Sequence, residues 1–152
     1  RRLAGVSAND DTTDAADTAG TADTADSAIA GLSVLGDTVR HPIEHVEVFR
    51  APDHVAMVRF STEELQSVCP VTGQPDLSSL VIEYEPDRAC IESKSLKLYL
   101  WGFRDRAVFA EALAAEIAGE VMATASPRWV RVALTQRQRG GIEVHAVSEI
   151  DR

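Results

Sequence analysis

Hydrophobic and polar residues alternate along several short stretches of the chain, a pattern typical of strands that bury one face. Turn residues separate these stretches: Pro52 lies in the turn between the first two, and a Gly-rich turn at 136–141 precedes the last. The pattern predicts strands at 44–50, 54–60, 78–85, 129–134 and 142–147.

Two helices are predicted between the third and fourth strands, at residues 93–104 and 108–124. In both segments the large apolar side chains recur at helical spacing. Lys94, Lys97, Trp101 and Arg104 fall on another face of the first helix. The apolar stripes comprise Leu96, Tyr99, Leu100 and Phe103 in the first helix and Phe109, Leu113, Ile117 and Val121 in the second.

This order of elements predicts an α+β fold. Strands, two consecutive helices and a final hairpin favour an antiparallel sheet that carries both helices on one face. The other face of the sheet then needs cover, which favours an oligomer.

The first 30 residues differ in composition from the rest of the chain. Residues 5–28 consist mainly of Ala, Thr, Asp and Gly, with a loose Thr-Ala-Asp repeat. Such a segment cannot bury enough apolar surface to offset the entropy of the chain. We therefore predict a disordered acidic tail over residues 1–30 and a single domain over residues 31–152.

The net charge of −9 comes mostly from this tail. Residues 3–39 hold seven Asp and no Lys or Arg, so with Arg1 and Arg2 included, a charge of −4 is left for residues 40–152. We expect no direct nucleic-acid partner. No apolar stretch approaches the ~18 residues of a membrane span, and no signal-peptide pattern opens the chain, so we predict a cytoplasmic protein without a membrane contact.

Cys69 and Cys90 are the two cysteines of the chain. Two cysteines do not make a disulfide framework, which agrees with a reducing compartment, and a Cys69–Cys90 bridge is left open. The four histidines have no metal-ligand spacing with the cysteines, so we expect no metal site.

The segment Cys69–Asp76 concentrates chemical groups in a short stretch. It reads Cys-Pro-Val-Thr-Gly-Gln-Pro-Asp. The turn residues around the cysteine argue against a periodic position on a helix face. A thiol and a carboxylate on one short loop can supply a nucleophile and a proton donor to one substrate atom. A small buried cysteine without a chemical role is the alternative.

Two segments are candidate anion sites. The segment Glu92–Lys97 opens the first helix, with Ser93 as a good N-cap and two lysines near the positive end of the helix dipole. Free backbone N–H groups and two ammonium groups suit a phosphate. The second segment is the turn at 136–141, where glycines let the backbone approach a ligand closely. For the first segment, the alternative is a pair of solvated surface lysines. For the second segment, the alternative is an ordinary hairpin turn. The groups in question are Lys94 and Lys97 in the first segment and Arg137, Arg139, Gly140 and Gly141 in the second.

Together these residues resemble QueF, the family of NADPH-dependent 7-cyano-7-deazaguanine reductases, in its short, single-module form. The resemblance covers about residues 60–145 and is carried by Cys69–Asp76 and by Glu92–Tyr99. The Glu-Ser-Lys-Ser-x-Lys motif at residues 92–97 is specific to the family. Two further segments also match the family's sequence pattern: Pro127-Arg128 and Arg139–Ile142.

The resemblance implies a tunnel fold, in which the antiparallel sheets of several subunits form a barrel with the helices outside. Pentamers that stack as decamers would have active sites between subunits. The implied reaction reduces a nitrile to a primary amine with two NADPH per turnover, in the queuosine pathway of tRNA modification. Cys69 would attack the nitrile carbon to form a covalent thioimide, and Asp76 would protonate the nitrogen.

The resemblance also implies the binding residues. Glu111 would hold the amino-pyrimidine edge of the deazaguanine. The family usually has Phe-His-Glu where this chain has Phe109-Ala110-Glu111; because the loss of a general acid–base group costs about 10²–10⁴-fold, we expect a slow reductase. The substrate positions are Ile91, Glu92, Ser93, Ala110 and Glu111, and the NADPH positions are Ser93, Lys94, Lys97, Arg139 and Gly140.

Two other functions are left open. A related enzyme could form the same thioimide and pass it to an amine donor without NADPH, as an amidine synthase. Lys94, Lys97 and Arg139 argue against this reading, because such an enzyme needs no phosphate-binding groups. A non-catalytic deazapurine-binding protein is the second alternative, and Ala110 is its only support.

Overall fold

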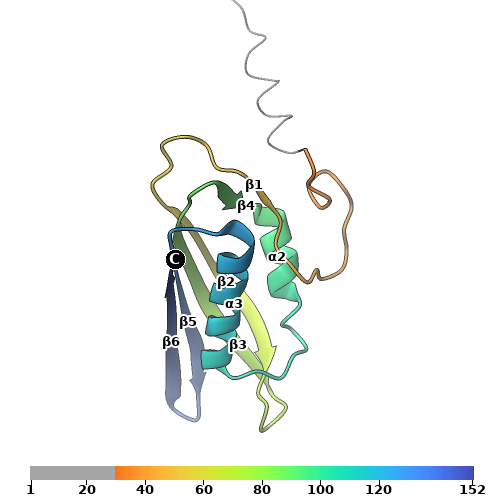
Figure 1. Cartoon of the computed structure of the whole chain (residues 1–152). Coiled ribbons are helices and arrows are strands. Elements are labelled where there is room, and N and C mark those ends of the chain that lie inside the picture. Colours follow the sequence, from red (N-terminus) through yellow and green to blue (C-terminus); the bar gives the residue numbers. More distant parts are fainter. Residues whose placement is uncertain (1–29) are drawn as a thin grey trace, which may run out of the picture.

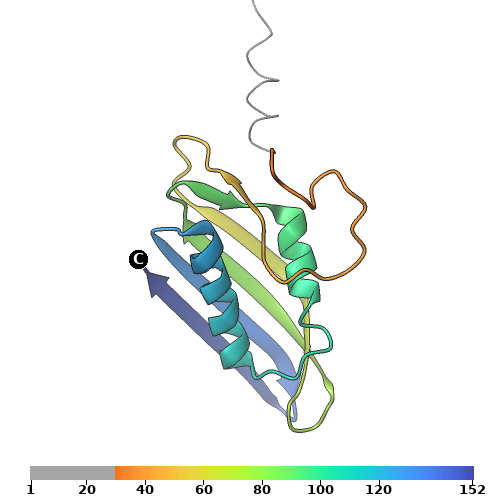
Figure 2. The same cartoon turned by 45° about the vertical axis from the view of Figure 1, so that its right-hand side comes forward.

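The computed structural model describes residues 30–152, so the tail predicted over residues 1–30 lies almost entirely outside the described residues. The described part is an α+β structure built on a four-stranded antiparallel sheet in the order β2-β3-β5-β6. Both helices lie on one face of this sheet (Figures 1 and 2), as predicted. The strands of the main sheet are β2 (Val58–Val68), β3 (Pro75–Glu85), β5 (Trp129–Arg139) and β6 (Ile142–Asp151).

A second, two-stranded sheet joins β1 (Val48–Arg50) to β4 (Ala89–Ile91). β4 leads directly into α2 (Ser93–Trp101), and α3 (Ala110–Ala125) follows after a stretch of turns. The small sheet therefore lies where α2 begins (Figure 1).

The core lies between the main sheet and the two helices. Alternate residues of β3 and β5 are buried on the helix side of the sheet, which confirms the alternation predicted for these two strands. The predicted stripe of the second helix is confirmed at three positions, each at most 1% exposed. These core side chains are Leu80, Ile82 and Tyr84 of β3, Val130, Val132 and Leu134 of β5, and Leu113, Ile117 and Val121 of α3.

The prediction was wrong for Phe109. This residue is the N-cap of α3 and is 57% exposed, because the helix begins one position later at Ala110. An apolar residue just before a helix continues the spacing of the stripe, but its extended backbone turns the side chain away from the core.

The strand boundaries also differ from the prediction. Residues 44–47 are not in a strand, residues 54–57 precede β2, and β2 continues to Val68. The register of β2 against β3 shifts between Thr62 and Leu65, and this irregularity breaks the alternation that sequence reading depends on. β4, which has only three residues, was not predicted.

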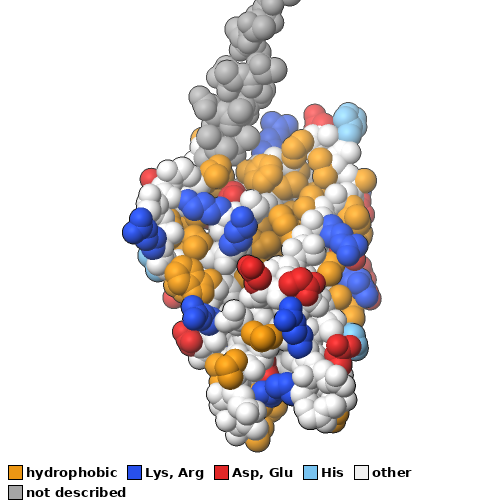
Figure 3. Space-filling model, turned by 180° about the vertical axis from the view of Figure 1, so that it is seen from behind, with side chains coloured by type: hydrophobic (Ala, Val, Ile, Leu, Met, Phe, Trp, Pro, Cys, Tyr) orange, Lys and Arg blue, Asp and Glu red, His pale blue; other side chains and the backbone are white. Residues whose placement is uncertain are grey.

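The face of the sheet away from the helices carries a row of alternating charges. Arg59, Glu83, Arg131 and Glu149 are direct cross-strand partners in the four strands. The three successive ion pairs measure 3.2, 3.6 and 2.9 Å. Figure 3 shows basic and acidic side chains close together on this side. This row of paired charges is stable in contact with water, and the cover of the rest of this face in an oligomer stays a prediction.

Candidate active site

Cys69 lies directly after β2, in the tight turn that joins β2 to β3. The backbone N–H of Cys69 donates to the carbonyl of Gln74 at 2.9 Å, and the N–H of Gly73 donates to the carbonyl of Cys69 at 2.9 Å. Gly73 has a φ of 70°, which an L side chain rarely adopts. The two bonds close the turn and hold the thiol at one end of the sheet.

The sequence suggested that Asp76 lies on the same loop as Cys69. In the structure Asp76 is instead the second residue of β3. It pairs with Ser67 of β2 and points to the helix side of the sheet. Asp76 is only 2% exposed, so its carboxylate needs a buried partner. That partner is Arg139 at the end of β5, whose Nη2 lies 2.9 Å from Oδ1 of Asp76.

The surroundings of Cys69 favour its thiolate. The Thr72 hydroxyl, the backbone N–H groups of Thr72 and Val71 and, to a smaller extent, Arg139 stabilise the sulfur and lower the pKa of Cys69 from 9.0 to about 7. Thiolate is the reactive form of cysteine. Sequence reasoning missed Thr72, although a Cys-x-x-Thr-Gly turn is a recognisable signal for a hydroxyl that turns back toward the thiol.

We therefore expect Cys69 to be alkylated rapidly near neutral pH. Below the pKa of about 7 the thiol is protonated, so the alkylation rate should rise through pH 6–8 and level off above it. Cys90 is buried and its pKa is raised by burial, so it should react much more slowly. Iodoacetamide labelling followed by peptide mass spectrometry measures both sites. Faster labelling of Cys90 than of Cys69 at pH 7 would contradict this assignment.

Glu92, rather than Ser93, is the N-cap of α2. Its carboxylate accepts the backbone N–H groups of Lys94 and Ser95, both at 2.7 Å. Two of the N–H groups expected for a phosphate at this helix start are therefore occupied by the chain itself. The ammonium group of Lys94 donates to the carbonyls of Val34, at 2.6 Å, and Asp37.

The replacement Glu92→Ala should destabilise the protein. The carboxylate is 6% exposed and caps two N–H groups, so its loss should lower the free energy of unfolding by about 1–2 kcal/mol. Urea unfolding monitored by circular dichroism measures the change. As a control, Glu44→Ala removes an exposed carboxylate and should change the free energy of unfolding by less than about 0.5 kcal/mol.

The predicted site residues fall at two ends of the subunit. The hydroxyl of Tyr84 accepts the N–H of Ile91 at 2.9 Å, so Ile91 and Glu92 lie at the Tyr84 end of β3. Asp76 lies eight residues earlier in the same strand, or about 26 Å away at ~3.3 Å per residue. Cys90 is beside Tyr84, so a Cys69–Cys90 bridge within one chain is excluded by distance, and both thiols are free.

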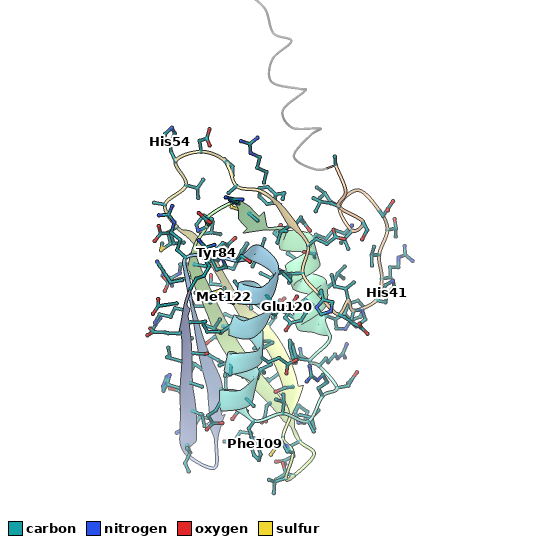
Figure 4. All side chains as sticks on the ribbon, viewed as in Figure 1. His41, His54, Tyr84, Phe109, Glu120 and Met122 are labelled. Atoms are coloured by element: carbon teal, nitrogen blue, oxygen red, sulfur yellow. The ribbon has the colours of Figure 1, made fainter. Side chains whose placement is uncertain are left out.

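The start of α3 belongs to the Cys69 end. The N–H of Val108 donates to the carbonyl of Val68 at 3.2 Å, which places this helix start beside the strand that precedes the thiol. Figure 4 shows Phe109 and Tyr84 at opposite ends of the molecule. Ala110 is 5% exposed and packs in the core, whereas Glu111 is exposed in the first turn of α3.

A groove of about 740 Å³ runs between α2 and the edge strand β2. Ser93 and Lys97 line it, as do Trp101 and Arg104, to which the sequence analysis assigned no role. Within residues 30–152, Lys97 and Arg104 form no ion pair, so their charges are available to an anion. The sequence analysis had already placed Lys97, Trp101 and Arg104 on one face of the first helix, and their spacing of about one or two turns is the signal for it.

Two features are absent from the described part of the chain. Among residues 30–152, no three His, Cys, Asp or Glu side chains gather in a way that could hold a metal ion. In the same range, no helix has the length and apolar character needed to cross a membrane.

The fold and the site define an α+β protein with an activated cysteine and a buried, arginine-paired aspartate at one end of its sheet. The model of the family described as QueF-like protein matches residues 75–152. The chain belongs to this family, which confirms the resemblance stated from the sequence.

Individual relatives support the same conclusion. The NADPH-dependent 7-cyano-7-deazaguanine reductase of Syntrophus aciditrophicus is 42% identical over 123 residues, which cover 80% of this chain and 87% of the relative. The reductase of the same name from Nitrosococcus oceani is 39% identical over 110 residues, covering 71% and 85%. Among solved structures, the apo form of the archaeosine synthase QueF-Like matches with a TM-score of 0.60 and 29% identity, covering 64% of this chain and 95% of that one. The predicted α+β, tunnel-fold class is thereby confirmed for the single chain, while the oligomeric barrel stays a prediction.

Proposed function

We propose that this protein reduces the nitrile of 7-cyano-7-deazaguanine to 7-aminomethyl-7-deazaguanine with NADPH. The observation that carries the proposal is the placement of Cys69, with its pKa of about 7, at the same end of the sheet as the buried Asp76. A nitrile carbon is attacked by a thiolate, and the nitrile nitrogen then needs a proton. The names of the relatives supply the substrate and the reductant.

In the first step the Cys69 sulfur forms a bond to the nitrile carbon, and one C–N π bond breaks. The Asp76 carboxylate takes up the Cys69 thiol proton as the sulfur attacks and passes it to the nitrogen, so a thiol and a nitrile become a thioimide, and Asp76 returns to the carboxylate that pairs with Arg139. The burial of Asp76 keeps bulk water away from this proton. Glu111 is exposed at the same end, where it can accept the amino-pyrimidine N–H groups of the substrate.

The α2 side of the groove between α2 and β2 offers positive charge to the phosphates of NADPH, through Lys97 and Arg104. Ser93 and Trp101 add a hydroxyl and an aromatic surface, while the β2 side carries the carboxylates of Glu63 and Glu64. NADPH, when bound, supplies the hydrides that take the thioimide carbon to the amine. Lys94 and Arg139 have partners within the chain, so their predicted contacts with the cofactor would require a change of partners.

We propose that the complete site forms between subunits of a homo-oligomer, with a pentamer or a decamer as the expected size. Within one chain, Ile91 and Glu92 lie about 26 Å from Asp76, too far to line a pocket for one small substrate together with Cys69. A neighbouring copy can bring its Glu92 end to the Cys69 end of the first. Sedimentation at several concentrations tests this assembly, and a monomer with full reductase activity would contradict it.

Incubation with the nitrile and NADPH tests the function. We expect NADPH oxidation, and a protein mass increased by that of the nitrile when NADPH is left out. Because the family histidine is replaced by Ala110, the turnover should be slow. A mass increase without NADPH oxidation would instead support the amidine synthase, a reaction type that the archaeosine synthase neighbour brings into consideration. Binding without any adduct would support the non-catalytic deazapurine-binding protein.

A further inference from the structure

A short segment before β1, residues 33–37, lies against the start of α2, and we call it the N-terminal strap. Figures 1 and 2 show this segment, in orange, beside α2. The Val34 side chain is 3% exposed, whereas Leu35 is 41% exposed and the two residues that follow are also exposed. One buried side chain therefore anchors the strap, and polar contacts hold the rest of it in place.

The carboxylate of Glu47 holds the backbone of the strap. It accepts the N–H of Ser33, at 2.9 and 3.1 Å from its two oxygens, the N–H of Val34 at 3.1 Å, and the hydroxyl of Ser33. The backbone of Glu47 is in turn bound to the start of α2, because its carbonyl accepts the N–H of Glu92 at 2.8 Å and its N–H donates to the Ser95 hydroxyl at 2.9 Å. One residue thus joins the strap to the helix start that borders the proposed NADPH groove.

The ammonium group of Lys94 binds the strap from the helix side. It donates to the carbonyls of Val34, at 2.6 Å, and of Asp37. An ammonium group has three donors, so the strap uses two of them. Lys94 lies about one turn before Lys97 on the same face of α2, and Lys97 and Arg104 line the groove. The strap therefore binds the first of three cations along this side of the helix and the turn after it.

A tight turn brings both carbonyls to Lys94. The N–H of Asp37 donates to the carbonyl of Val34 at 3.3 Å, and Gly36 between them has a φ of 90°. An L side chain rarely adopts this conformation, so the closed form of the strap depends on the glycine.

A phosphate in the groove would attract Lys94 more strongly than the strap does. The strap offers the ammonium group two neutral carbonyls, whereas a phosphate adds the attraction of a full negative charge. The strap closes over Lys94 without a cofactor, however, so a cofactor that uses this lysine must first open the strap. A state that has to be opened lowers the apparent affinity for the ligand.

We propose that the N-terminal strap is an autoinhibitory contact, which withholds Lys94 from the phosphates of NADPH until the strap opens. The proposal rests on the proposed function for the identity of the anion, and it adds a closed and an open state to that function. In the closed state, which the structure shows, Lys97 and Arg104 are the cations of the groove. In the open state Lys94 joins them.

The test measures amide hydrogen exchange of the full chain with and without NADPH, by mass spectrometry of the peptide that holds residues 33–37. The N–H groups of Ser33 and Val34 are bonded to Glu47, so they exchange slowly while the strap is closed. We expect saturating NADPH to speed their exchange at least about tenfold, since the cofactor binds best to the open state. Unchanged or slower exchange with bound NADPH would overturn the proposal, because the strap would then be a fixed part of the site.

Variants that open the strap test the same point by affinity. Glu47→Ala removes the carboxylate that holds the strap, and Gly36→Ala strains its turn at a position where an added Cβ meets no neighbour. Both should tighten NADPH binding about threefold to tenfold in a fluorescence titration, because less of the protein is closed. Adding Lys94→Ala to either variant should remove the gain, and Glu44→Ala is the matched control. Weaker or unchanged binding in both strap variants would contradict autoinhibition.

The strap and the proposed function fail in different ways. If the nitrile gives no adduct and NADPH neither binds nor is oxidised, the proposed function is wrong. Pyrophosphate then replaces NADPH in the exchange experiment, since it presents the same phosphate chemistry to Lys94. Faster exchange of the strap with pyrophosphate would support the autoinhibitory contact, and unchanged exchange would overturn it. Circular dichroism confirms that each variant is folded, and Gly36→Ala keeps the affinity test decisive if Glu47→Ala is unstable.

Discussion

The replacement Cys69→Ala should abolish both adduct formation and NADPH oxidation. The thioimide is a bond to the Cys69 sulfur, and no other described group at this end of the sheet is a comparable nucleophile. We expect activity to fall by at least about 10³-fold, as is usual when a covalent nucleophile is removed. Intact-mass measurement after mixing with the nitrile, followed by NADPH absorbance, gives both readings.

Cys90→Ala is the matched control for this experiment. Cys90 is buried beside Tyr84, at the other end of β3 from Cys69, so its replacement should leave the adduct unchanged and cost only packing energy. The replacement of Cys69 should have little effect on folding, because the side chain is partly exposed in a turn. NADPH oxidation that depends on the nitrile and persists in Cys69→Ala would disprove the covalent mechanism.

The sequence predicted the fold class because its two periodicities reflect burial directly. Ile117 and Val121 recur at helical spacing because one face of α3 lies on the sheet, and Leu80 and Ile82 alternate because one face of β3 is covered. The prediction fails where other interactions decide the local structure. The irregular register after Thr62 and the three-residue strand β4 depend on strand pairing, which leaves no periodic signal.

The site was predictable in its residue types and only partly in its geometry. The short segment Cys69–Asp76 holds the proposed nucleophile and the proposed acid, and local turn chemistry holds the thiol. The ion pair between Asp76 and Arg139 joins strands that are distant in sequence, and only the pairing of β3 with β5 brings them together. Lys94 was read as an anion-binding residue, yet it donates to two carbonyls of the segment before β1. Composition does not show such contacts.

Asp76→Asn should separate the attack of the sulfur from the transfer of a proton to the nitrile nitrogen. Asparagine keeps the size of the buried side chain and can still accept a hydrogen bond, but it cannot deliver a carboxyl proton. Adduct formation and turnover should therefore fall by about 10²–10⁴-fold. Alkylation of Cys69 needs no proton donor, and the loss of a neighbouring carboxylate favours the thiolate, so its rate at pH 7 should be maintained or should rise.

The contrast between the alkylation rate and the rate of adduct formation identifies Asp76 as the acid rather than as a structural partner of Arg139. A purely structural role would change alkylation and adduct formation together, since both depend on how the thiol is held. Asp87→Asn is the matched control, because Asp87 also pairs with an arginine, Arg152 at 2.9 Å, but lies beyond the Tyr84 end of β3. Adduct formation by Asp76→Asn within about threefold of the unchanged rate would mean that the nitrile nitrogen takes its proton from another group.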